Sequence, residues 1–321
     1  MNKKQITTSA LLGLAVGDAF GVPYEFMHRE EVRKRSTKNM EGCDTNPRDL
    51  GMWSECVPAG AWSDDTSMTI AAMDSIVDSG GNIDYCDIMR RFSLWWNKGD
   101  YTPFGFPFGL GGTCSRALTN YSKGVPALEC GPKQITDNGN GSLMRILPFS
   151  LYCILNNLTM PETVKLIDNA SSLTHGHEIS KLGCLIFTVF LKELIERDNV
   201  REAWEAARKV NYSEYYPRTA INAYAGLRSP AFYDADDSCI NESGYVVDTL
   251  TAAVYAMLHG SDYESSIMIA LNLGYDTDTT CAITGALAGA FYGNIPERWL
   301  NRLLKRGWLE TLADRFSACL T

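Results

Sequence analysis

The sequence contains no C-x-x-C pair, no internal repeat and no low-complexity tract. Its ten cysteines are scattered from Cys43 to Cys319, which favours reduced, mostly buried thiols over a disulfide framework or a zinc site. Uninterrupted apolar runs are short, and 184–187 and 189–191, on either side of Thr188, cannot span a bilayer. Two lysines precede an apolar N-terminal segment, but no cleavage site of small residues follows it. We therefore expect a cytoplasmic protein with no membrane partner.

Basic residues are also too few and too dispersed to form a nucleic-acid surface. The chain has 29 Lys and Arg against 38 Asp and Glu, a net charge of -9 and a sequence pI near 5.0. Nucleic acids and anionic membranes are bound by clustered Lys and Arg, so we expect no nucleic-acid partner. With 321 residues, 45% of them hydrophobic and 11% aromatic, the chain is long and apolar enough to bury a sizeable core.

The apolar residues recur with helical spacing, and no stretch shows sustained alternation with a period of two. The sequence therefore predicts an all-α fold. The clearest predicted helices cover 8–19, 67–77, 87–97, 143–152, 179–194, 202–210, 250–258 and 281–292. Glycines within the first and last of these segments, such as Gly285 and Gly289, would let another backbone come close. Between 28 and 61 the composition is charged, with Gly and Pro and no steady period, which predicts a lid or binding loop.

Pairs of acids stand directly before two of these buried helices. The run 274–280, Gly-Tyr-Asp-Thr-Asp-Thr-Thr, places Asp276 and Asp278 among hydroxyls, and Asp64 and Asp65 follow Ser63 in the same way. A single acid or hydroxyl at such a place is best explained as a helix cap. Adjacent like charges need a cation or a basic partner, and carboxylate and hydroxyl oxygens suit a hard divalent cation. If the two helices lie side by side, the four carboxylates converge on one point.

Three further segments are candidates for binding or catalysis. Glu25 lies between two aromatic residues in a loop, so its carboxylate is either partly buried with a partner or functional, whereas Asp18 is equally well explained by a turn hydrogen bond. The turn 137–142 is rich in Asn and Gly, and its backbone N–H groups could face an anion such as a phosphate. His175 and His177 lack a further Cys or His nearby, which favours substrate contact over metal ligation.

Together these segments resemble the ADP-ribosylglycohydrolases. The matching pieces are 13–21 (Gly-Leu-Ala-Val-Gly-Asp-Ala-Phe-Gly) with Pro23 and Glu25, then 63–66, 139–145, Thr174-His175, 244–249 and 274–279. They occur in the family's order from residue 11 to about residue 292, although 28–61 carries no family motif. The resemblance implies a single orthogonal all-α domain over residues 1–321 and a centre of two Mg²⁺ or Mn²⁺ ions. The implied metal ligands are Ser63 or Thr66, Asp64, Asp65, Asp276, Asp278 and Thr279.

The resemblance also implies how a substrate is held. The pyrophosphate would lie on the turn formed by Gly139, Asn140, Gly141 and Ser142, with Asn140 and Asp137 facing the ribose that carries the leaving group. His175 would contact that ribose or a phosphate, and Tyr245 would stack on the adenine. Catalysis would involve Asp65 and Asp276 through the metals and either Glu25 or Asp137 as the group that handles the proton, a choice that the sequence leaves open.

The implied activity is hydrolysis of the glycosidic bond that joins ADP-ribose to a modified protein, with arginine as the favoured linkage because 139–145 looks closest to the bacterial arginine-directed branch. Alternatives are a hydrolase of serine-linked or small-molecule ADP-ribosyl compounds, and a non-catalytic, crystallin-like member that binds ADP-ribose. All four core aspartates are present, which argues against the non-catalytic alternative. We expect a monomer.

Overall fold

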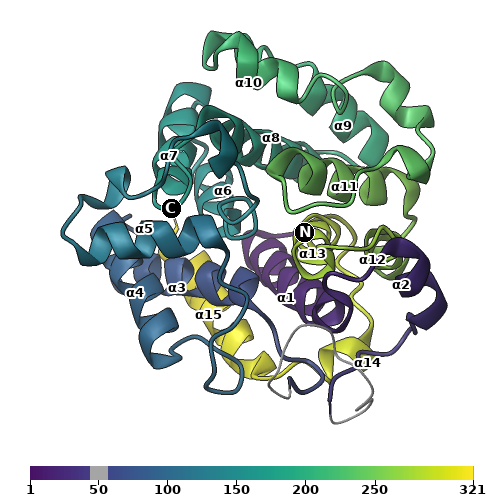
Figure 1. Ribbon diagram of the computed structural model, residues 1–321, viewed down its shortest axis with the longest axis horizontal. Coiled ribbons are helices and arrows are strands. Elements are labelled where there is room, and N and C mark those ends of the chain that lie inside the picture. The colour runs from purple at the N-terminus through teal and green to yellow at the C-terminus, as the bar shows by residue number, and fades with distance from the viewer. Residues whose placement is uncertain (44–56, 321) are drawn as a thin grey trace.

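The computed structural model describes residues 1–43 and 57–320, and within them all regular structure is helical. The α-helices are α1 (Lys3–Gly21), α2 (Arg29–Arg35), α3 (Asp64–Asp78), α4 (Tyr85–Lys98), α5 (Gly112–Ser122), α6 (Leu147–Leu155), α7 (Met160–Ser172), α8 (Glu178–Glu196), α9 (Val200–Arg208), α10 (Arg218–Ala223), α11 (Val246–His259), α12 (Tyr263–Asn272), α13 (Thr277–Tyr292), α14 (Glu297–Leu300) and α15 (Arg306–Cys319). Short 3-10 helices cover Val22–Tyr24, Ala127–Glu129, Ile135–Asp137, Tyr212–Glu214, Pro230–Asp234 and Asp237–Cys239. The prediction of an all-α fold is confirmed (Figure 1).

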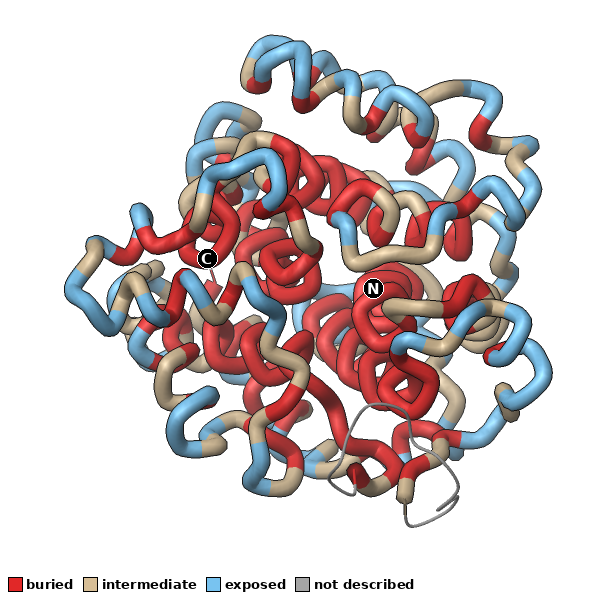
Figure 2. The backbone as a smooth tube through the Cα atoms, in the orientation of Figure 1, coloured by how far each residue is buried: buried red, intermediate tan, exposed pale blue. Residues whose placement is uncertain are grey.

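Helices α1 and α13 pack along each other at the centre of the molecule, with α3, α8, α11 and α12 around them (Figure 1). Most residues of both central helices are buried, as Figure 2 shows. Glycines allow this close approach: a Cβ built on Gly285 would lie 2.1 Å from the carbonyl oxygen of Gly13, and one on Gly17 would lie 2.1 Å from that of Cys281. The two helices therefore touch through their backbones, which fixes their relative position.

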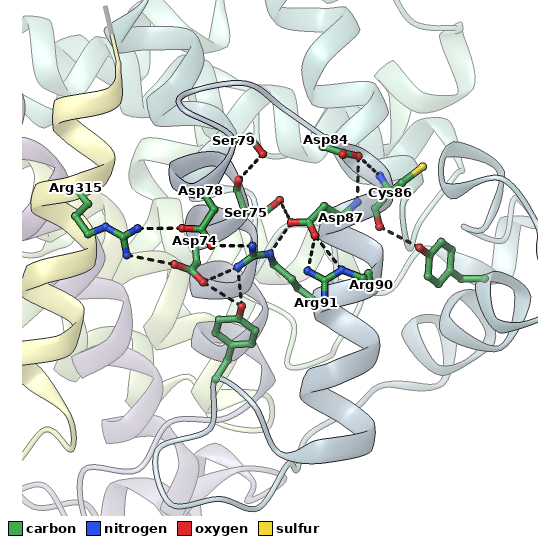
Figure 3. Close-up of polar contacts among 12 residues, drawn as sticks. Asp74, Ser75, Asp78, Ser79, Asp84, Cys86, Asp87, Arg90, Arg91 and Arg315 are labelled. Carbon is green, nitrogen blue, oxygen red and sulfur yellow. Dashed lines mark hydrogen bonds and ion pairs between the residues drawn. The ribbon is translucent and has the colours of Figure 1, made fainter.

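An ion-pair network holds α3 against α4 and α15 on the side of the molecule shown in Figure 3. Arg91 of α4 donates to Asp74 at 2.5 Å and to Asp78 at 2.9 Å, both on α3, and also to Asp87 on its own helix. Arg315 of α15 donates to Asp78 at 2.9 Å. Because one guanidinium serves three carboxylates and is mostly buried, this network orients α3, the helix that carries Asp64 and Asp65.

Part of the predicted lid is a helix rather than a loop. Helix α2 has Glu30 and Glu31 in its first turn and three basic residues in its last, an arrangement that the helix dipole favours. Its Arg29 is paired with Glu242 and donates to the carbonyl oxygens of Asp237 and Ile240. A prediction from hydrophobic periodicity missed α2 because Val32 is its single buried residue. Residues 44–56 of the predicted lid lie outside the described residues.

By length and hydropathy, Lys3–Tyr24 is long and apolar enough to cross a membrane, but 89% of its most apolar window is buried inside the protein, as in a core helix.

Among the described residues, eight cysteines are free, whereas Cys43 is disulfide-bonded. The expectation of reduced thiols is therefore wrong at Cys43.

Candidate active site

Asp18 joins the C-terminal end of α1 to the beginning of α3. Its fully buried carboxylate accepts hydrogen bonds from the backbone N–H of Ser63 at 2.9 Å, the backbone N–H of Thr66 at 3.0 Å and the Thr66 hydroxyl at 2.6 Å. Burial raises the pKa of Asp18 to about 6, although these hydrogen bonds favour the ionised form. Asp18 thus satisfies N–H groups at the start of a neighbouring helix rather than in a local turn.

Asp65 links the start of α3 to the start of α13. Its Oδ2 accepts from the Ser63 hydroxyl at 3.0 Å and from the Thr279 hydroxyl at 3.4 Å. Its Oδ1 is buried and has no hydrogen-bond partner among the described residues. Burial, followed by the charges of Asp18, Asp64 and Asp276, raises the pKa of Asp65 well above its usual value. A buried carboxylate oxygen without a partner is costly, and a cation at this point would satisfy it.

A short backbone bridge brings Glu25 to the start of α13. The N–H of Phe26 donates to the carbonyl oxygen of Tyr275 at 2.5 Å, and the N–H of Tyr275 donates to that of Met27 at 2.6 Å. Tyr275 adopts the left-handed backbone region with φ of 61°, which turns the chain immediately before Asp276. The loop after α1 and the acidic run of 274–280 are therefore held face to face.

The acids form two groups that share Asp278. Oxygen atoms of Asp18, Asp65 and Asp278 lie within 4.8 Å of one another, and so do oxygen atoms of Glu25, Asp276 and Asp278. Burial, followed by repulsion from Glu25, raises the pKa of Asp278 well above its usual value. Burial and the charge of Asp18 raise the pKa of Asp64 to about 8. Clustered oxygen donors whose charges oppose one another are the donor set that binds a hard divalent cation, so the residues present fit a metal site.

The acidic centre forms one wall of a cleft of about 220 Å³. The cleft is lined by Glu25, Phe26, Asp64, Gly109, Gly111, Gly112, Thr113, Cys114, Gly139, Asn140, Gly141, Met144, His175, Gly244, Asp276, Asp278 and Thr279. Asp64 and Asp278, from helices far apart in the sequence, therefore face the same cavity. The residues from 109 to 114 include the N-terminal end of α5, where Gly111 leaves the first N–H groups without a side-chain cap.

The turn at Gly139 to Gly141 is positioned from both sides. Gly139 forms an isolated bridge with Tyr245, and the backbone N–H of Asn140 donates to Gly244 at 3.0 Å. The amide of Asn140 donates to Asp276 at 2.8 Å and to Thr249 at 3.0 Å. Asn140 therefore connects the turn directly to the acidic centre. Tyr245 is partly exposed beside the turn and is not among the residues that line the cleft.

The two histidines have different positions. His175 lines the cleft, and burial followed by the charges of Arg145 and Arg116 lowers its pKa to about 3, so its imidazole is neutral. His177 instead begins α8, where its Nδ1 accepts from the backbone N–H of Ile179 at 3.2 Å. The structure thus places only His175 of this pair at the cavity.

Six predicted site residues do not line the cleft, namely Asp65 and Tyr245, described above, and Asp137, Ser142, Ser63 and Thr66. Asp137 is paired with Arg116, accepts from the backbone N–H of Gln134 at 2.8 Å, and borders a separate surface pocket. The Ser142 hydroxyl contacts Ser171 and Cys184 in the core. Ser63 and Thr66 are buried behind the acids and bond to Asp65 and Asp18. The Ser142 side chain is therefore directed away from the cavity that the other turn residues line.

Two parts of the site carry no clear signal in the sequence. Asp18 was equally well explained by a turn, because its partners Ser63 and Thr66 are more than 40 residues away. The loop from Gly109 to Thr113 contains no acidic, basic or histidine side chain that would mark it as part of a site. Gly109 has a positive φ of 90°, and a Cβ there would lie 2.2 Å from Asp64, so this glycine lets the loop approach the acid.

In the absence of metal, we expect the cluster of acids to make the folded protein less stable as pH rises. The pKa values of Asp18 and Asp64 are raised to about 6 and about 8, so each proton binds more tightly in the folded state. Stability from these groups is present below about pH 4, the ordinary pKa of Asp, and is lost as pH rises through the folded values. In EDTA, we expect Tm to fall between pH 5 and pH 8, and saturating Mg²⁺ to raise Tm most at pH 8.

Asp65→Asn provides the control for this measurement, because it removes one of the repelling charges. In EDTA its Tm at pH 8 should exceed that of the unmodified protein, and its response to Mg²⁺ should be smaller. A metal-free Tm that is unchanged or higher at pH 8 than at pH 5 would contradict the account of the cluster.

The fold and the site define a class of all-helical proteins with an oxygen-rich acidic centre at the meeting point of helix ends. A family model described as ADP-ribosylglycohydrolase matches residues 2–320, and the chain belongs to this family of enzymes. The chain is 28% identical over 308 residues to an ADP-ribosylarginine hydrolase of Serratia proteamaculans, covering 95% of this chain and 77% of that protein. It is 29% identical over 300 residues to the ADP-ribosyl-dinitrogen reductase glycohydrolase of Rhodospirillum rubrum, covering 92% and 88%.

A solved structure supports the same assignment. A chain of an ADP-ribosylglycohydrolase-related protein complex superposes with a TM-score of 0.77 at 28% identity, covering 99% of both chains. The resemblance drawn from the ordered motifs is therefore confirmed.

Proposed function

We propose that the protein hydrolyses the glycosidic bond between ADP-ribose and a modified protein side chain, with arginine as the preferred linkage. The observation that carries this proposal is the cleft in which Asp64, Asp276 and Asp278 face the glycine turn and His175. The arginine linkage is supported by the name of the relative from Serratia proteamaculans, an ADP-ribosylarginine hydrolase. A modified protein as substrate is supported by the name of the relative from Rhodospirillum rubrum, an ADP-ribosyl-dinitrogen reductase glycohydrolase.

We further propose that the acids hold two Mg²⁺ or Mn²⁺ ions, because two groups of three acids share Asp278. Asp64, Asp65, Asp276, Asp278 and the Thr279 hydroxyl are the proposed ligands. Asp18 belongs to one of these groups but is not counted as a ligand, since hydrogen bonds from Ser63 and Thr66 take three of the roughly four lone-pair sites of its carboxylate. When bound, the metals would supply charge compensation and a water of lowered pKa.

The protein's own residues would bind the substrate and position the acids. The backbone of Gly139 to Gly141 and the neutral His175 face the side of the cleft where the pyrophosphate would lie, and Asn140 holds Asp276 in place. Hydrolysis forms a bond from the water oxygen to the anomeric carbon and breaks the bond from that carbon to the side-chain nitrogen. One proton of the water must reach the departing nitrogen, and nearby carboxylates stabilise the positive charge that develops on the sugar.

We assign the proton transfer to Glu25 rather than to Asp137. Glu25 lines the cleft within the group of Asp276 and Asp278, whereas Asp137 is paired with Arg116 beside another pocket. A general acid or base must reach the reacting atoms directly or through one water, and the position of Glu25 meets this condition better.

The proposed function is tested with defined substrates. The purified protein is incubated with peptides that carry ADP-ribose on arginine or on serine, with Mg²⁺, with Mn²⁺ and with EDTA, and released ADP-ribose is measured. We expect metal-dependent release from arginine, and loss of release in EDTA. Release from the serine peptide alone would show that the protein cleaves the serine linkage instead of the arginine linkage. ADP-ribose binding without metal-dependent release from either peptide would refute the proposed activity.

A further inference from the structure

Arg145 is a fully buried cation next to the cleft that has no carboxylate partner among the described residues. Its Nη2 donates to the carbonyl oxygen of Ala170 at 3.0 Å and to the Thr174 hydroxyl at 2.7 Å. Its Nε and Nη1 have no hydrogen-bond partner among the residues described, and its guanidinium lies over the ring of Phe92, 5.0 Å from the centroid. A buried guanidinium with unused donors is unfavourable for stability alone, so its contact with Thr174 calls for a functional explanation.

Thr174 stands between Arg145 and the histidine of the cleft. Its Oγ1 lies 3.0 Å from Nδ1 of His175 and accepts from Arg145 on its other side. A guanidinium can only donate, so Thr174 must use a lone pair toward Arg145 and keeps one proton to donate. Cys114 also lies near this hydroxyl, but a thiol sulfur is a weaker acceptor than an imidazole nitrogen. In the opposite arrangement Nδ1–H would donate to the second lone pair of the hydroxyl, whose proton would be left with the Cys114 sulfur, so the better acceptor strength of the imidazole favours donation from Thr174 to Nδ1.

The other ring nitrogen of His175 faces the glycine turn. A Cβ built on Gly139 would lie 3.5 Å from Nε2, and one on Gly141 would lie 3.6 Å from Nε2 and 2.9 Å from Cε1. The imidazole therefore packs directly against the backbone of the turn, and a side chain at Gly141 would displace it. Since Nδ1 accepts a hydrogen bond, the proton of the neutral ring must sit on Nε2, which points toward the ligand side.

We propose that Arg145 and Thr174 fix His175 in the tautomer protonated on Nε2, so that the histidine is a permanent hydrogen-bond donor to an anionic oxygen of the ligand. Arg145 and Thr174 are positioning residues, because they act through His175 and do not line the cleft. The tautomer follows from the hydrogen bonds alone, whereas the identification of the bound oxygen as part of ADP-ribose rests on the proposed function. Burial, followed by the charges of Arg145 and Arg116, opposes protonation of His175, which keeps the ring neutral and its donor role constant.

The tautomer is measured by nitrogen NMR on the Mg²⁺-loaded full chain with ¹⁵N-labelled histidine. The chain has four histidines, so a His175→Gln sample identifies the signals of His175 by their absence. We expect an Nε2 that carries a proton and an Nδ1 that does not. Thr174→Ser keeps the hydroxyl and should retain this pattern, whereas Thr174→Val should give a mixture of tautomers. A proton on Nδ1 in the unmodified protein, or an unchanged pattern in Thr174→Val, would overturn the proposal.

Ligand binding provides the second readout, with ADP-ribose itself as the titrant. Thr174→Val should weaken ADP-ribose binding by about two- to tenfold, the range that the loss of one hydrogen bond produces, and Thr174→Ser should bind nearly as tightly as the unmodified protein. Circular dichroism verifies that each variant is folded. If the unmodified protein does not bind ADP-ribose, the proposed function fails, while the NMR result still decides the tautomer.

Discussion

Replacing Glu25 with glutamine is expected to lower kcat by about 10²- to 10⁴-fold, the usual contribution of a positioned proton donor or acceptor. Glutamine keeps the size and hydrogen-bonding capacity of the side chain but cannot exchange a proton at neutral pH. Glu25 belongs to the same group of acids as Asp276 and Asp278, so its substitution also removes one negative charge from the cleft. Metal affinity should be measured beside kcat, to separate loss of proton transfer from loss of the ion.

Asp137→Asn is the matched comparison, because Asp137 is the other carboxylate that the sequence left open for this role. Its salt bridge to Arg116 and its bond from the N–H of Gln134 give it a local structural role. We expect a modest loss of stability, and a kcat within about tenfold of the unmodified enzyme, far less than removal of a proton-transfer group costs. A larger fall in kcat for Asp137→Asn than for Glu25→Gln would reverse the assignment.

Substituting Gly285 with alanine is expected to destabilise the protein by about 3 kcal/mol, at the upper end of the effect of overpacking a core. The added Cβ would lie 2.1 Å from the backbone carbonyl oxygen of Gly13, and a backbone atom cannot rotate away as a side chain does. Helices α1 and α13 must then separate, and they carry Asp18 and Asp278 at the ends that form the site. The free energy of unfolding is measured by denaturant titration with and without Mg²⁺.

Gly307→Ala is the control for helix propensity, since Gly307 is also in a helix but a Cβ there meets nothing within 4 Å. It should be neutral or stabilise by up to about 1 kcal/mol, the difference between Gly and Ala in a helix. Equal effects of the two substitutions would show that the contact between α1 and α13 tolerates a wider separation.

The parts of the molecule that follow from local sequence were predictable. Long apolar segments with helical spacing became α1, α3, α8, α11 and α13, and the acidic runs at 64–65 and 276–278 begin two of these helices as expected. Periodicity works for these helices because each buries a continuous face in the core. It fails for α2, which is held by dipole-compatible charges and by Arg29 rather than by an apolar face.

Features that depend on contacts between distant segments could not be predicted from the sequence. The role of Asp18 requires knowing that α3 begins beside the end of α1, and the different environments of Asp137 and Ser142 depend on Arg116, Ser171 and Cys184. Neighbours in sequence can face opposite sides of a chain: in the turn at 139–142, Gly139 to Gly141 face the cleft while Ser142 enters the core. Residue types alone therefore gave the chemistry of the site but not its full membership.

The side chain of Asn140 touches Asp276 at 2.8 Å while its backbone forms part of the turn at the opposite wall. Any movement of that turn on ligand entry also changes the surroundings of Asp276, and a change at Asp276 acts back on the turn. For the divalent ion and the ADP-ribose proposed as ligands, thermodynamic linkage makes this effect reciprocal. The factor by which the ion would alter affinity for ADP-ribose equals the factor by which ADP-ribose would alter affinity for the ion. One amide thereby makes occupancy of the two halves of the cavity interdependent.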